Sequence, residues 1–215
     1  MALHSEVGVP MRELLVAAAC LLGSTSFAAG ESASDAVVID NPSVRVLRTS
    51  RPPVPAEHPA AVVVPLHDGA ARKAGEAYWT GEASLRSNDG AAGPFIVVEV
   101  KSPTPPATPG TAAEKGTKPG EQPSTGLSFR PLFENERVAV LRARMEVGAK
   151  EGFHTHARDI VVVHLSGGAV EDTAEGRTKV NRWKRGDVEF EGRGTSHSAR
   201  NAGGAIDVVL VTLKP

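Results

Sequence analysis

The chain has 215 residues, and its 24 Lys and Arg nearly balance 25 Asp and Glu, giving a formal net charge of −1. A nucleic-acid-binding surface needs clustered positive charge, so this balance, without a basic block, argues against a nucleic-acid partner. Glycine (22) and proline (16) are abundant, and the apolar runs after residue 35 are short and rich in valine. Long amphipathic helical stretches are absent. The composition therefore predicts an all-β fold.

The first 28 residues have the pattern of a signal peptide. Arg12 precedes the apolar run Leu14–Leu22, and Ser26 and Ala28 occupy the −3 and −1 places of a small-residue cleavage site. The apolar run is shorter than the about 20 residues of a membrane-spanning helix. We therefore expect an exported protein, periplasmic or secreted, without a membrane span.

Two features of this segment leave alternatives open. Residues 1–10 add nothing to the signal pattern, so Met11 is a second candidate for the true start. Cys20, the single cysteine, could mark a lipoprotein, but Ala17 stands where leucine is usual. If Cys20 is removed with the signal, the mature chain has no disulfide, and its stability must come from its core.

Three regions follow in the mature chain. Residues 35–101 contain strand-like apolar runs, and residues 102–127 form a linker or long loop rich in Pro, Gly and Thr, with almost nothing to bury. Residues 128–215 return to valine-rich runs punctuated by glycine. We expect two β domains, 35–101 and 128–215.

The two β regions repeat one another in order, with an offset that grows from 94 to 113 residues. The second copy therefore has insertions, and two of them, one of which is the largest, carry histidines that the first copy lacks. The matched segments are Asn41–Arg48 with Asn135–Arg142, Val62–Leu66 with Val161–Leu165, Trp79 with Trp183, and Asn88–Gly90 with Asn201–Gly203.

The histidines of these insertions form a candidate metal site. On a strand, His154 and His156 lie two residues apart and share one face, so both can approach one ion at about 2.0 to 2.1 Å. His197 can supply a third ligand if its strand pairs beside the first. Neutral imidazole binds several transition metals, so the pattern predicts a divalent ion (Fe, Mn, Cu, Ni or Zn) without choosing among them.

These residues resemble the two sequence motifs of the cupin superfamily. The segment from Gly148 through His154-Thr-His156 to Gly167 is similar to the first motif, and Gly186 through His197 to Asn201 is similar to the second. The resemblance implies a double-stranded β-helix (jelly-roll) barrel with a metal in its mouth. Together with the internal repeat, it implies a bicupin whose first half is degenerate and lacks the metal loops.

Two positions depart from the cupin pattern. Gly192 replaces the usual proline, which a turn tolerates. Ile160 occupies the place of the glutamate ligand, so three neutral donors would remain around the ion, with positions open to water, dioxygen or substrate. Asp159 is adjacent, but only a β-bulge would direct it to the metal.

Other polar or aromatic residues have less specific interpretations. His164 lies too far along its strand from Ile160 to be a fourth ligand, and we expect it at a barrel end or on the surface. We expect Trp183, like Trp79, to have a packing role. Glu189 and Glu191 alternate with apolar residues and indicate a solvated strand face, and Asn201 fits a turn.

Two functions from different classes remain open. In one, the chain is an exported metalloenzyme, a dioxygenase or isomerase that acts on a small molecule. In the other, it is a non-catalytic cupin that binds a metal or a small ligand. No general acid or base can be assigned once the three histidines serve as ligands, which weakens the first. The first copy could serve as a lid or a subunit interface, which leaves a homodimer open.

Overall fold

The computed structural model describes residues 35–51, 56–58, 60–70, 72–81, 93–101, 106 and 124–215. The predicted signal peptide, including Met11 and Cys20, lies outside these residues, as does most of the predicted linker. Every regular element in the described part is a β-strand, which confirms the all-β prediction. No helix there is long and apolar enough to cross a membrane.

Residues of the first copy form a five-stranded antiparallel sheet. Its spatial order is β1-β2-β5-β3-β4. Valine-rich runs bury most of both faces of the three middle strands, with Arg45 and Arg48 exposed. The strands are β1 (Ala36–Asp40), β2 (Val44–Thr49), β3 (Ala61–Pro65), β4 (Tyr78–Trp79) and β5 (Phe95–Val100).

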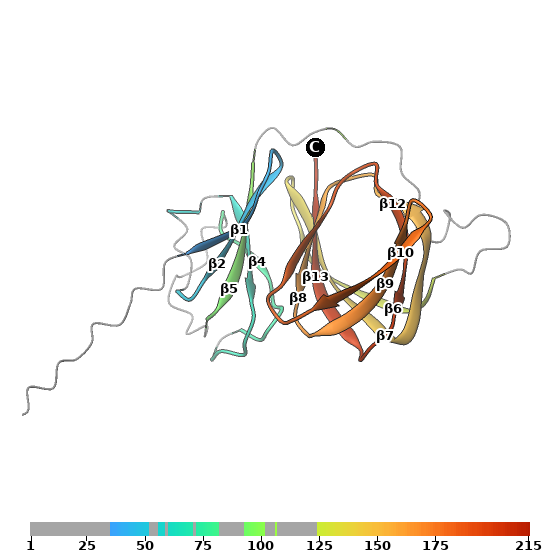
Figure 1. Cartoon of the computed structure of the whole chain (residues 1–215). Helices are drawn as coiled ribbons and strands as arrows, with labels where there is room; N and C mark the ends of the chain where they lie inside the picture. Colours follow the sequence, from blue (N-terminus) through green and yellow to red (C-terminus); the bar gives the residue numbers. More distant parts are fainter. Residues whose placement is uncertain are drawn as a thin grey trace, which may run out of the picture. The chain divides into compact units, whose positions relative to one another are not determined.

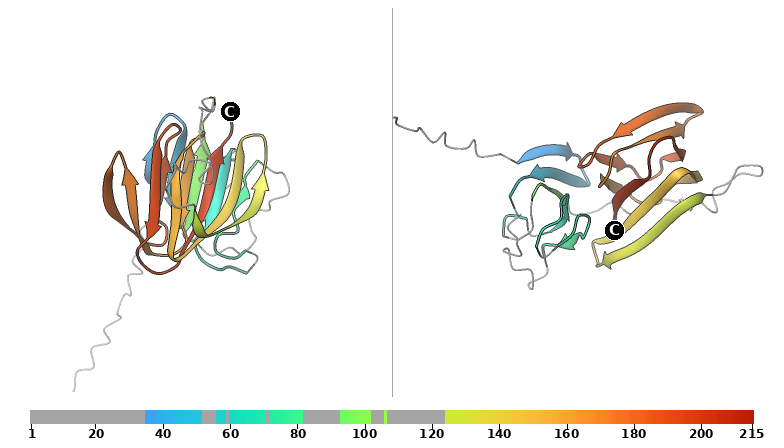
Figure 2. Two further views of the ribbon diagram at one scale, coloured as in Figure 1. Left: turned by 90° about the vertical axis from the view of Figure 1, so that its right-hand side faces the viewer. Right: turned by 90° about the horizontal axis from the view of Figure 1, so that it is seen from below.

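The second copy forms an eight-stranded antiparallel sheet that curls on itself (Figure 1). Its order is β10-β9-β12-β7-β13-β8-β11, and β6 pairs with β7 in a long hairpin drawn in yellow in Figure 2. β6 begins at Thr125, inside the predicted linker. The strands are β6 (Thr125–Glu134), β7 (Val138–Thr155), β8 (Ile160–His164), β9 (Gly168–Ala174), β10 (Arg177–Trp183), β11 (Val188–Glu191), β12 (Ser196–Asn201) and β13 (Ile206–Leu213).

The strand registers of the two sheets correspond position by position. The strands of the first sheet, in the order β1-β2-β5-β3-β4, pair in the same way as β6-β7-β13-β8-β11 of the second sheet. Even the turns agree, since Asn41 and Asn135 each accept two backbone hydrogen bonds at the start of the following strand. Matching pairs are Val44 opposite Val100 and Val138 opposite Leu213, then Val62 opposite Val98 and Val161 opposite Val211.

One assignment of the sequence repeat is wrong. Trp79 lies opposite Val62, and the residue in the same position opposite Val161 is Phe190. Trp79 therefore corresponds to Phe190, and Trp183 belongs to β10, a strand without a counterpart in the described part of the first copy. Two tryptophans in similar sequence surroundings suggested an equivalence that the strand pairing does not support.

Equivalent valines of both sheets meet in one hydrophobic cluster. The outward-facing residues of β8, such as Val161 and Val163, pack there with Val62 and Val64 of β3, and all four are fully buried. The alternate residues of β8 face the barrel interior. The further cluster members are Val44, Val46, Leu66, Ile96, Val98, Val100, Val138, Val140, Leu165, Val209, Val211 and Leu213.

Within the described residues, the first copy has no equivalent of β9, β10, β12 or the distal half of β7. These elements carry the histidine loops of the second copy. The described part of the first copy is thus a single sheet that packs against the sheet of the second copy through the shared hydrophobic cluster. The agreement of registers supports the bicupin duplication, which stays a prediction, as does the division into two domains.

Candidate metal centre

Two antiparallel strands bring the three predicted histidines together. His197 of β12 lies directly opposite His154 of β7, so their side chains share a face. His156 follows the end of β7, where its N–H donates to the carbonyl of Thr195 at 2.9 Å. The preceding turn requires a positive φ at Gly194 (80°), a conformation that glycine adopts without strain.

The three imidazole rings converge on one point. Their centroids are 4.7, 4.7 and 5.0 Å apart, and one nitrogen from each lies within 4.8 Å of the others. The Nε2 atoms of His156 and His197 are 3.1 Å apart. Nitrogens bound at about 2.0 to 2.1 Å in tetrahedral or octahedral geometry are separated by about 2.8 to 3.4 Å, so the spacing suits a shared ion.

Hydrogen bonds on the opposite ring nitrogens orient two of the ligands. His154 Nδ1 donates to the carbonyl of Gly152 at 3.0 Å, and His197 Nδ1 lies 2.9 Å from Asp172 Oδ1. A donor role for Nδ1 leaves the Nε2 lone pair facing the common point. Such partners fix the tautomer and raise the basicity of histidine ligands.

Two glutamates flank the cluster, and neither was predicted from the sequence to belong to the site. Glu191 Oε2 lies 3.6 Å from His156 Nε2, and Glu151 Oε1 lies 3.6 Å from His154 Nε2. Glu191 pairs directly with Ile160, so it faces the interior beside the position of the missing motif carboxylate. A register irregularity between β7 and β12 turns Glu151 to the same side as the histidines.

The prediction that Glu189 and Glu191 form a solvated strand face is wrong. Both line the barrel cavity, whereas Val188 and Phe190, which alternate with them, pack on the shared cluster between the sheets. The alternation was correct, but the apolar residues face the first sheet and the acids face inward.

The electrostatics of the site follow from burial and crowding. Burial raises the pKa of Glu191 to about 8. Burial, with the nearby rings of His154 and His197, lowers the pKa of His156 to about 4. Burial also lowers the pKa of His197, but the carboxylates of Glu191, Glu151 and Asp172 outweigh it, so the net shift is upward. His156 is therefore a neutral donor near pH 7.

Asp159 does not replace the missing glutamate. Its carboxylate accepts hydrogen bonds from Ser43 Oγ at 2.6 Å and from the backbone N–H of Arg193 at 2.8 Å. It therefore points toward the first sheet, on the opposite side of β8 from the cavity. Asn201 fits its predicted turn role, since its Oδ1 accepts from Gly203 N–H and its Nδ2 donates to the carbonyl of Gly204. The same Nδ2 also donates to the carbonyls of Met145 and Glu146 in β7.

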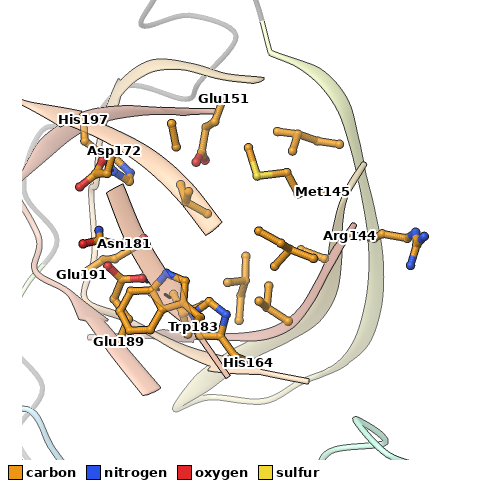
Figure 3. A pocket seen from close by; sticks show the side chains of 18 of the residues that line it. Arg144, Met145, Glu151, His164, Asp172, Asn181, Trp183, Glu189, Glu191 and His197 are labelled. Atoms are coloured by element: carbon orange, nitrogen blue, oxygen red, sulfur yellow. Dashed lines mark hydrogen bonds and ion pairs between the residues drawn. The ribbon is translucent and has the colours of Figure 1, made fainter. Parts of the chain in front are cut away.

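A cavity of about 130 Å³ adjoins the histidine cluster. His197, Glu151 and Asp172 line one side, and His164 and Trp183 line the opposite side (Figure 3). Of the two expected places for His164, a barrel end or the surface, the surface is wrong, because the residue is 3% exposed. Trp183 stacks on His164 and also lines the cavity.

No family model matches the sequence, and no curated protein matches it. Among solved structures, the chain is similar to a cupin domain from Bordetella pertussis, with 25% identity and a TM-score of 0.40 over 42% of this chain and 95% of that one. An RmlC-like cupin from Shewanella frigidimarina has 20% identity and a TM-score of 0.36, covering 42% and 78%. The polyketide cyclase RemF from Streptomyces resistomycificus has 16% identity and a TM-score of 0.37, covering 43% and 68%.

The strand topology and the motif residues of this chain themselves indicate a cupin-type fold. The curled antiparallel sheet places both sequence motifs at neighbouring strands, and their histidines form one cluster beside an interior cavity. Residues 125–215 have the cupin-type (jelly-roll) fold.

Proposed function

We propose that the protein binds a divalent transition metal through His154, His156 and His197 and acts as a metalloenzyme on a small organic molecule held in the barrel. The observation that carries this proposal is the convergence of three imidazole nitrogens at one side of a mostly apolar cavity. A bound divalent ion would supply Lewis-acid or dioxygen chemistry to an oxygen-bearing substrate. Coordination by three histidines would leave positions on the ion open for the substrate.

The chain's own residues have separate tasks in this proposal. Asp172 holds His197 in place through Nδ1, and Gly152 does the same for His154. Glu151 and Glu191 stand next to the ligand nitrogens, where either can complete the coordination. Glu151 can accept a substrate proton, and Glu191, whose pKa burial raises to about 8, can donate one. These carboxylates supply the acid or base that the sequence alone could not assign, which favours an enzyme over a non-catalytic binder.

Elemental analysis of the purified full-length protein, followed by oxygen-uptake assays, tests the proposal. We expect about one equivalent of iron, manganese, copper, nickel or zinc, and turnover with a phenol, diketone or thiol. His197→Ala should lose the metal, and the matched control His67→Ala, at an exposed position outside the barrel, should retain it. Metal without turnover or isomerisation of any such substrate would favour the binding protein. Absence of metal after purification and reconstitution would refute the site.

We further propose that residues 1–28 direct export and are removed. N-terminal sequencing of the protein from the cell envelope or medium tests cleavage after Ala28. A homodimer would need a surface other than the outer face of β8 and β13, because the first sheet already packs there. Sedimentation analysis of the full chain decides the oligomeric state.

A further inference from the structure

His164 is a buried polar residue whose ring lacks hydrogen bonds among the described residues. The residue is 3% exposed, and neither ring nitrogen has a hydrogen bond in that part of the chain. Trp183 covers one ring face, with centroids 4.6 Å apart and an interplanar angle of 17°. Glu189 Oε2 lies 4.0 Å from Nε2, beyond hydrogen-bond distance. Native proteins rarely leave such a group unsatisfied, so His164 suggests a missing ligand.

The cavity beside His164 limits the size of that ligand. Its volume of about 130 Å³ is on the order of protein cavities that hold a benzene-sized molecule. Most of its wall is apolar, which favours a ligand with an apolar body. The apolar lining residues are Leu127, Phe129, Ala143, Met145, Val162, Val170, Ala199, Ile206, Val208 and Leu210.

The charges around the cavity limit the ligand's charge. Four acidic residues line the wall: Glu151, Asp172, Glu189 and Glu191. Arg144, the basic residue of the lining, pairs with Glu146 at 2.7 Å. Burial lowers the pKa of His164 to about 4, so its ring is neutral near pH 7 and offers one donor and one acceptor. An organic anion would face four acidic side chains without a free cation among the described lining residues, so an anionic ligand is disfavoured. The neutral His164 ring in a mostly apolar wall suits an uncharged ligand with a hydroxyl group better than a cation.

We propose that His164 and Trp183 form a binding subsite for a small, uncharged, mostly apolar molecule whose hydroxyl group hydrogen-bonds to the His164 ring. An aromatic alcohol of the size of phenol fits the volume, the apolar wall and the neutral imidazole. The subsite deepens the proposed function, because a molecule anchored at His164 lies in the cavity that adjoins the histidine cluster (Figure 3). Binding at His164 itself does not require the metal.

Calorimetric titration of the full-length protein tests the subsite with three probes: phenol, toluene as a match without a hydroxyl, and benzoate as an anion. We expect phenol to bind at least fivefold more tightly than toluene, and benzoate to bind more weakly than both. His164→Phe keeps a ring against Trp183 but removes the nitrogens, so it should weaken phenol binding about tenfold and leave toluene within twofold. His67→Phe, the same substitution at an exposed position, should change neither.

Nuclear magnetic resonance of ¹⁵N-labelled His164 in the wild-type protein provides a test that does not depend on the folding of a variant. Phenol should shift a ring nitrogen of His164, and toluene should not. Wild-type protein that does not bind phenol, or a phenol preference unchanged by His164→Phe, would overturn the subsite. Running each titration with and without reconstituted metal separates the proposals: phenol binding without metal uptake supports the subsite and refutes the metal site.

Discussion

Replacing His164 by phenylalanine should change how the stability of the protein depends on pH. The His164 pKa is lowered from 6.5 to about 4 by burial in the folded state. Below pH 6.5 the unfolded chain takes up a proton at this position, and the folded protein does not until the pH nears 4. Wild-type stability is therefore fully present above 6.5 and is lost as the pH falls toward 4.

The magnitude follows from the two pKa values. Between pH 8 and pH 5, this single group removes about 2 kcal/mol from the free energy of unfolding, at 1.36 kcal/mol per pKa unit. Phenylalanine does not titrate, so the variant should lose about 2 kcal/mol less than the wild type over the same interval. All other titrating groups are shared by the two proteins and cancel in the difference.

Urea unfolding of the metal-free proteins, followed by circular dichroism at several pH values, measures this difference. His67→Phe serves as the control, because His67 is exposed and should leave the pH dependence at its wild-type value. Parallel stability curves for wild type and His164→Phe would refute the reasoning. They would mean that water or a conformational change lets the folded protein protonate His164 as readily as the unfolded chain.

Glu191→Gln should lower metal affinity at least tenfold, and by more than Glu151→Gln does, because Glu191 lies opposite Ile160, the position of the missing motif ligand. Competition with a chromophoric chelator measures the metal affinity of both variants. Equal losses in the two variants, or no loss in either, would contradict this assignment. Asp172→Asn should lower metal affinity about 10- to 100-fold, because Asp172 orients the ligand His197. The control Glu171→Gln, on the same strand, removes only a surface ion pair and should change metal affinity less than twofold in the same assay. Val98→Ala should reduce the free energy of unfolding by about 2 kcal/mol, because Val98 is fully buried in the cluster between the sheets. Urea unfolding measures this loss. A loss under 0.5 kcal/mol would show that the sheets do not share a core.

The histidine motif could be located without coordinates because it depends on local spacing. His154 and His156 share a face through the period of a strand, and the glycines around His197 provide the turn that aligns it. Matching segments in the same order revealed the strand repeat, and the registers of the two sheets follow its offsets. Those features needed only alternation and turn chemistry, which are properties of neighbouring residues.

Alternation shows which residues share a face of a strand, but it cannot show which face points inward. The barrel interior is partly polar and its outer face is covered by a second apolar sheet, so the usual assignment of apolar residues to the inside failed at Glu189 and Glu191. The same reversal hid the burial of His164, and a local bulge brought Glu151 to the site.

The sequence by itself determined the all-β fold, the strand repeat and the three histidines, since each depends on spacing along the chain. Only the tertiary structure decided that Asp159 faces the first sheet, that Glu151 and Glu191 flank the histidine cluster, and that His164 lines its cavity. Those outcomes depend on how two sheets pack and which strands become neighbours, and long-range packing leaves no periodic signal in a single sequence.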